Sequence, residues 1–105
     1  MDLQAMAHNA EQAEALLKLM ANKSRLMILC RLQQGEVSVS ELNDSIPLAQ
    51  SALSQHLASL RNAGIVSTRR EGQVIYYRVV DERVAVILKS LYEVFCQQGD
   101  INERG

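Results

Sequence analysis

Apolar residues recur every three or four positions along much of this chain, which is the spacing of one helix face. The first such stripe lies in residues 10–20, at Ala10, Ala13, Leu16, Leu17 and Met20. A second helix is expected from Asn22, which can cap it, to a stop at Gly35. Because residues 25–32 are apolar almost all round, we expect this helix to be central.

Two shorter helices are predicted next. Ser38 and Glu41 have the spacing of a capping box, and the helix that they open is expected to end near Ile46, because Pro47 cannot continue it. After a short turn, a second helix is predicted by leucines spaced i, i+4 and i+7, with Gly64 just past its end. Its opposite face is small or polar, at Gln50, Ser51, Ser54, Gln55 and Ala58.

The pattern then alternates, as in strands. Residues 66–70 and 74–79 are rich in β-branched and aromatic side chains and flank a turn at residues 71–73, which predicts a hairpin. Asp81 can cap a last helix, and a polar tail begins at about residue 99. The broad apolar face of that helix comprises Val84, Ile87, Leu88, Leu91, Tyr92 and Phe95.

Length and composition limit the possible classes. A chain of 105 residues, 48% hydrophobic and 22% charged, is typical of one globular domain over residues 1–105. No apolar run is long enough to span a bilayer, and residues 1–4 do not resemble a signal peptide, so a cytoplasmic protein without membrane contact is expected. The two cysteines, Cys30 and Cys96, are too few for a secreted disulfide framework.

The order of elements predicts an α+β, mostly helical fold in which a helix-turn-helix over residues 38–63 precedes a hairpin. Glutamine and serine at the start of the second short helix can read base edges in a major groove, and arginines beside the hairpin turn can reach phosphates. Alternatively, these polar residues only solvate a surface helix. The candidate base-reading residues are Gln50, Ser51, Ser54, Gln55 and His56. The candidate wing contacts are Arg69, Arg70 and Gln73.

The charge distribution is compatible with a nucleic-acid partner. The formal net charge is only −1, but residues 47–80 hold four arginines against one acid, and residues 15–35 hold four basic residues and no acid. A nearly neutral chain can therefore carry a positive face, whose affinity for DNA would come from counter-ion release. Scattered, solvated charge is the alternative.

Three runs together resemble one known family. Residues 20–29 look like the second helix of ArsR-family winged-helix repressors, residues 50–61 like their recognition helix, and residues 72–77 like their wing. The resemblance covers roughly residues 10–98. It implies five helices, a two-stranded hairpin wing and a homodimer that binds double-stranded DNA at an inverted-repeat operator. The apolar excess of the first and last helices fits pairing across a two-fold axis.

The residues at the family's sensing positions separate its branches. Metal-sensing relatives carry thiolates where this chain has Ser38-Val39-Ser40, and another metal branch uses four ligands in the last helix. Of those four positions only Asp81 is kept, and the other three hold Arg83, Val94 and Gln97. We therefore expect no metal site and no cofactor.

The two cysteines resemble those of a thiol-sensing branch, which includes the sulfane-sulfur repressors and HlyU-type regulators. That resemblance implies a repressor whose DNA affinity falls when Cys30 and Cys96 form a disulfide or polysulfide in response to reactive sulfur or oxidants, with Cys30 attacking and Cys96 resolving. Helix spacing places both thiols at a seam between helices. Two inert core cysteines would satisfy the same spacing.

Three other functions stay open. An HlyU-like activator that displaces a silencer needs the same groove contacts. A thiol oxidoreductase would use the same cysteines, although the chain has no CxxC motif and no evident acid–base pair. A dimerisation module would show no salt-dependent binding to DNA. One departure from the family is Ala49, which cannot cap the recognition helix.

Overall fold

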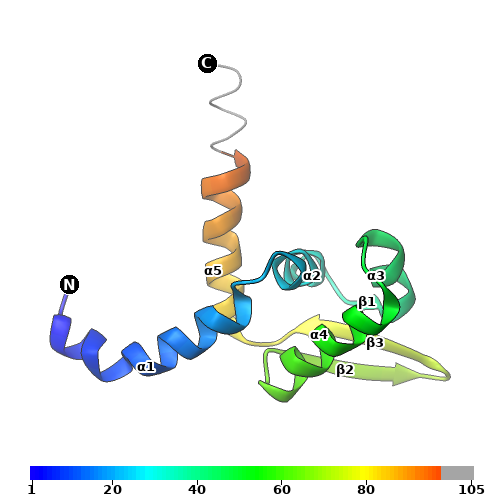
Figure 1. The fold of residues 1–105 in the computed structure, drawn as a ribbon, viewed down its shortest axis with the longest axis horizontal. Helices are drawn as coiled ribbons and strands as arrows, with labels where there is room; N and C mark the ends of the chain where they lie inside the picture. Colours follow the sequence, from blue (N-terminus) through cyan, green and yellow to red (C-terminus); the bar gives the residue numbers. More distant parts are fainter. Residues whose placement is uncertain (98–105) are drawn as a thin grey trace.

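Five α-helices and a three-stranded antiparallel sheet form this winged helix-turn-helix, seen in a computed structural model that describes residues 1–97 (Figure 1). The helices are α1 (Leu3–Met20), α2 (Lys23–Gln33), α3 (Val39–Ser45), α4 (Gln50–Asn62) and α5 (Glu82–Tyr92), and a π-helical turn, η1 (Glu93–Gln97), continues α5. The strands are β1 (Val37–Ser38), β2 (Val66–Glu71) and β3 (Val74–Val79). The α+β fold is confirmed, while the tail from about residue 99 lies outside the described residues.

Side-chain caps set the helix boundaries as expected. Asn22 caps α2 and Asp81 caps α5. Ser38 and Glu41 form the full capping box: the Glu41 N–H donates to Ser38 Oγ at 3.1 Å, and the Ser38 N–H donates to Glu41 Oε1 at 3.2 Å. The first helix is longer than predicted, because Asp2 caps it eight positions before the apolar stripe begins at Ala10.

The wing has a third strand that the sequence did not predict. The expected hairpin forms between β2 and β3, and the left-handed φ of 63° at Gly72 suits the first central position of its two-residue turn. In addition, β1 pairs with β3 through Val37 opposite Tyr77 and Ser38 opposite Tyr76. The two-stranded hairpin is thus confirmed, and β1, a strand too short to alternate visibly in the sequence, adds a third strand to give a sheet of order β1-β3-β2.

The core is built from one face of each helix and the base of the sheet. It joins Leu16 and Met20 of α1 to leucines of α4 and to Val84 and Leu88 of α5. The second helix buries Ile28, Leu29 and Leu32 in its centre. It is not covered all round, however, since its Met27 is 41% exposed and its Cys30 is exposed. We therefore correct the expectation of a wholly central second helix.

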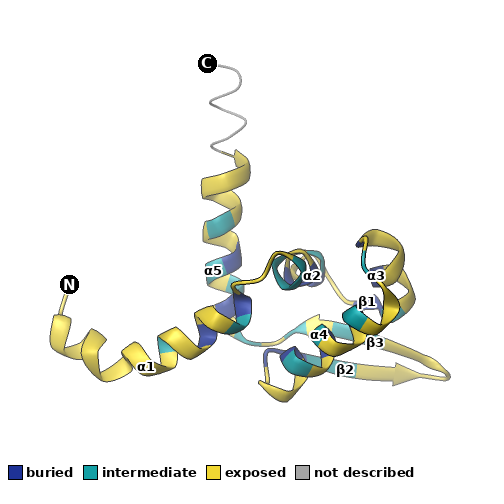
Figure 2. Ribbon diagram, viewed as in Figure 1, coloured by how far each residue is buried: buried dark blue, intermediate teal, exposed yellow. Residues whose placement is uncertain are grey.

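Parts of α1 and α5 extend away from this core, as Figures 1 and 2 show. The radius of gyration is 15.6 Å, whereas a compact chain of this length would have about 13 Å. Both extensions carry exposed apolar side chains, namely Leu3, Met6, Leu17, Val86, Tyr92, Val94 and Phe95. Within residues 1–97, no helix is both long and apolar enough to cross a membrane.

Candidate DNA interface and cysteine pocket

The solvent face of α4 collects four of the five candidate base-reading residues. Leu53, Leu57 and Leu60 anchor the helix in the core, and this leaves the opposite face free. Ala49 precedes the helix without any side-chain cap, as its sequence predicted. The residues exposed in the first two turns are Gln50, Ser51, Ser54 and Gln55.

His56, the fifth candidate, is placed differently. Its side chain is half-buried, and its Nδ1 accepts a hydrogen bond from Nε of Arg25 on α2 at 3.1 Å. Arg25 also donates from Nη1 to the carbonyl oxygen of Leu19 at 3.2 Å. Sequence reasoning missed this contact, because residues 31 positions apart on two helices leave no signal in their spacing.

Arg69 is the most constrained of the three candidate wing residues. It forms ion pairs with Glu36 at 2.8 Å and Glu71 at 2.7 Å, and its guanidinium lies 4.6 Å from the ring centroid of Tyr76. The hydrogen bond from Arg69 lowers the pKa of Glu36 below its ordinary range, so that carboxylate stays charged at neutral pH. Tyr77, the neighbour on the other face of β3, packs against the core.

Arg70 and Gln73 are exposed near the tip of the wing. Arg70 donates from Nε to the carbonyl oxygen of Gly72 at 3.0 Å, inside the turn. Within residues 1–97 no carboxylate lies within 4.0 Å of Arg70, so its positive charge is less compensated than that of Arg69. Of the two arginines that precede the turn, one thus lies in an ion-pair cluster and the other faces solvent.

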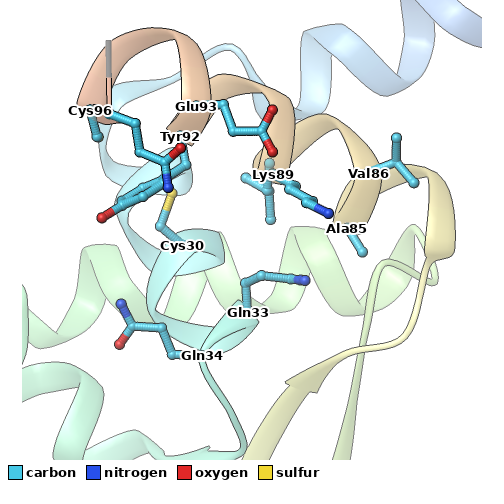
Figure 3. Close-up of a pocket in the computed structure, with 11 residues that line it drawn as sticks. Cys30, Gln33, Gln34, Ala85, Val86, Lys89, Tyr92, Glu93 and Cys96 are labelled. Carbon is cyan, nitrogen blue, oxygen red and sulfur yellow. The ribbon is translucent and has the colours of Figure 1, made fainter. Parts of the chain in front are cut away.

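Both cysteines line one pocket of about 690 Å³ between α2 and the end of α5 (Figure 3). Cys30 points from α2 toward the turn that carries Tyr92 and Cys96. Gln33, Gln34, Lys89, Glu93 and Gln97 supply the polar part of the lining. The prediction that the thiols share a helix–helix seam is confirmed, and both residues are exposed, so neither is a core cysteine.

Burial and the neighbouring thiol both affect the pKa of Cys30. Partial burial raises the pKa of Cys30 above its ordinary value of 9.0, and the negative charge of Cys96 raises it further. Cys30 therefore holds its proton more tightly than a fully solvated thiol does. The same residue also borders a smaller hollow of about 330 Å³ between α2 and the end of α3, lined by Met27, Arg31 and Ile46 among others.

The residues at the metal positions of the family have other partners here. Ser38 belongs to the capping box, and Asp81 both caps α5 and forms a 2.7 Å ion pair with Arg83. The hydrogen bond from Arg83 is the main reason that the pKa of Asp81 is lowered. In the part of the chain that the structure describes, no three His, Cys, Asp or Glu residues gather closely enough to hold a metal ion.

The polar face of α4 beside a projecting wing defines a winged helix-turn-helix protein of the DNA-binding class. Residues 22–68 match the bacterial regulatory proteins of the arsR family. The transcriptional activator HlyU of Vibrio cholerae is 47% identical over 97 residues, which are 92% of this chain and 90% of that protein.

Two solved structures are similar to this one. The transcriptional repressor BigR of Xylella fastidiosa has a TM-score of 0.87 and 41% identity, covering 91% of this chain and 98% of that one. Reduced HlyU of Vibrio cholerae has a TM-score of 0.83 and 46% identity, covering 89% and 98%. The chain belongs to the arsR family and is a regulator of transcription. Its relatives are regulators and not enzymes, so the oxidoreductase alternative is set aside.

Proposed function

We propose that this regulator binds an inverted-repeat operator as a homodimer, with α4 of each protomer in a major groove. Gln50, Ser51, Ser54 and Gln55 would read base edges, since they form the exposed face of a helix that the core holds rigidly. His56 would support that face from behind, because its ring already bonds Arg25. In the wing, Arg69, Arg70 and Gln73 would contact the backbone or the minor groove.

The homodimer is proposed from the exposed apolar surface of α1 and α5. These helices extend from the core with large side chains uncovered, of which Phe95 is 73% exposed. Pairing across a two-fold axis would cover this surface and set the two α4 helices about 34–36 Å apart, one turn of DNA. Sedimentation of the wild type and of Phe95→Glu tests this: the variant should shift toward monomer.

We further propose that Cys30 and Cys96 form a reversible bridge that lowers DNA affinity. The observation that carries this proposal is their shared pocket, which a small oxidant can enter because both cysteines are exposed. One of the similar solved structures is named as the reduced form of HlyU. A bridge would connect α2 to the end of α5, the helix proposed to pair in the dimer. It would therefore change the spacing of the two α4 helices and lower DNA affinity.

The bridge needs a two-electron oxidant, and a small persulfide, R–S–SH, can supply it. One cysteine thiolate attacks the terminal sulfur and releases R–S⁻, which leaves a cysteine persulfide. The second thiolate attacks the sulfur bonded to the first cysteine and expels HS⁻, which completes a disulfide. If the cysteine persulfide first attacks the terminal sulfur of a second R–S–SH and releases R–S⁻, the second thiolate can attack the sulfur bonded to that terminal sulfur, expel HS⁻ and form a trisulfide.

Two single variants test the thiol switch. Cys30→Ser and Cys96→Ser should each bind operator DNA as the reduced wild type does, and each should lose the response to a persulfide donor. Mass spectrometry of the treated wild type should show an intramolecular Cys30–Cys96 product. Release of DNA by either variant after its remaining thiol is blocked would exclude the two-cysteine mechanism.

The regulatory outcome has a second candidate. HlyU is named an activator, whereas BigR is named a repressor, and both resemble this chain over about nine-tenths of its length. An activator could act by displacing a silencer through the same groove contacts. Footprinting of the bound site relative to the promoter distinguishes the two: overlap with the promoter supports repression, and an upstream site shared with a silencer supports activation.

A further inference from the structure

One arginine side chain joins three helices behind the DNA-reading face. Arg25 lies in the first turn of α2, and it bonds His56 in the middle of α4 and the carbonyl of Leu19 in the last turn of α1. All three residues are half-buried. The final carbonyls of a helix have no intrahelical N–H partner, so the guanidinium satisfies a group that needs one.

This contact is the directional restraint on α4. Among the side-chain hydrogen bonds within residues 1–97, it is the one that joins α4 to another element. The start of α4 lacks a side-chain cap, since Ala49 has no side-chain acceptor. The buried leucines of α4 hold it in the core by close packing, and the Arg25 hydrogen bond adds a contact whose geometry depends on the rotation of the helix about its axis.

We propose that Arg25 is a positioning residue for DNA binding, which sets the orientation of the α4 reading face through His56. Gln55, the neighbour of His56, belongs to that face, and a small rotation of the helix moves its amide away from a base edge. Bidentate pairing with a base requires accurate placement, so loss of the Arg25 contact should weaken sequence-specific binding. The proposal depends on DNA binding alone and not on the thiol switch.

The contact also defines the chemical state of His56. When Nδ1 accepts this hydrogen bond, the ring carries its proton on Nε2, so the proposal predicts that tautomer. This state can be observed in the wild-type protein without any substitution. Long-range ¹H–¹⁵N spectra of the reduced full-length chain should show the Nε2–H tautomer for His56. A ring with its proton on Nδ1 would overturn the proposal.

The second test is a mutant cycle on DNA affinity. Fluorescence anisotropy would measure binding to an operator duplex selected in vitro with the wild type, and to a scrambled duplex. Arg25→Met keeps the aliphatic stem, and His56→Ala removes the acceptor. Each should weaken operator binding about ten-fold, the size of one charge-assisted hydrogen bond, and the double variant should be no weaker than either single one.

Two further variants separate positioning from charge and from simple destabilisation. Arg31→Met, on the same helix, measures the loss of one positive charge, and it should weaken operator binding less than Arg25→Met. His56→Asn can place an acceptor where Nδ1 lies, and it should recover binding relative to His56→Ala. Equal effects of Arg25→Met and Arg31→Met would overturn the proposal, as would independent, multiplied losses in the double variant.

Discussion

Glu36 and Arg69 form a 2.8 Å ion pair across the sheet, although they lie 33 residues apart. Glu36 directly precedes β1, and Arg69 lies on β2, at the opposite edge of the sheet. Between them runs β3, whose Tyr76 lies beneath the Arg69 guanidinium. A residue that the sequence predicts to touch phosphate is therefore already held by carboxylates. DNA must compete with Glu36 and Glu71 for this cation.

Glu36→Gln should remove one of the two carboxylates that hold Arg69, leaving Glu71, and should tighten DNA binding. Because the pair is partly exposed, we expect a gain of about two- to five-fold, with a steeper dependence on salt. Anisotropy titrations at several salt concentrations would measure both. Glu14→Gln removes the acid of an exposed pair on α1 and serves as the control for total charge. If both variants tightened binding equally, Arg69 would not be the group released.

Gln55→Ala should lower sequence specificity. The side chain is exposed on α4, where loss of a bidentate base contact costs on the order of 1–3 kcal/mol at the operator and little on scrambled DNA. Asn62→Ala, at the other end of the same helix, is the control. Equal losses on both duplexes would argue that Gln55 contacts only the backbone.

Alkylation of Cys30 should have an unusual pH profile. Its pKa is raised by burial and by the charge of Cys96, so the rate should still be rising at a pH where glutathione has levelled off. Peptide mass spectrometry after iodoacetamide treatment would follow Cys30 alone. In Cys96→Ser the negative neighbour is gone, and the midpoint should move down. An unchanged midpoint in that variant would mean that the two thiols are not electrostatically coupled.

Ala49→Ser should stabilise the protein. The backbone at this position is extended, with φ −62° and ψ 144°, which is the conformation of a capping residue. A serine oxygen there could accept from an N–H of the first turn and add about 1 kcal/mol to the free energy of unfolding. Urea denaturation would measure the gain against Ala63→Ser at the other end of α4. Equal changes would show that no cap forms.

Zinc should not change operator affinity in a reducing buffer. Ser38 and Asp81 are committed to helix caps, and Arg83 supplies a cation where a ligand would be needed. A zinc titration of the protein–DNA complex, followed by addition of a chelator, would test this. Stoichiometric release of DNA would indicate a site centred on Cys30 or Cys96.

Local chemistry explains which parts of the structure the sequence could predict. The side chains of Asn22, Ser38 and Asp81 accept hydrogen bonds from the first turn of the helix that each one caps, and Pro47 acts on its immediate neighbours. A few consecutive residues are therefore enough to predict these helix boundaries. By contrast, β1 exists only because β3 lies beside it. Its two residues have no pattern of their own.

The functional site also has parts that the sequence predicts and parts that it does not. The solvent face of α4 follows from helical periodicity, and its four exposed residues were predicted. The contacts of Arg25 with His56 and of Glu36 with Arg69 depend on how distant elements meet, which periodicity does not describe. The exposure of Cys30 was missed for a related reason: residues 26–30 are all apolar, but neighbouring elements cover only part of them.

Ser38 has two roles that together restrict where this chain can change in length. It ends β1, opposite Tyr76, and it begins α3 as the capping residue. An inserted residue at this point would break either the strand register or the capping box. The turn at Gly72 and Gln73 connects only two strands and can accept a longer loop. Insertions and deletions are therefore expected at the wing tip, while residues 37–41 provide a fixed reference for aligning proteins of this kind.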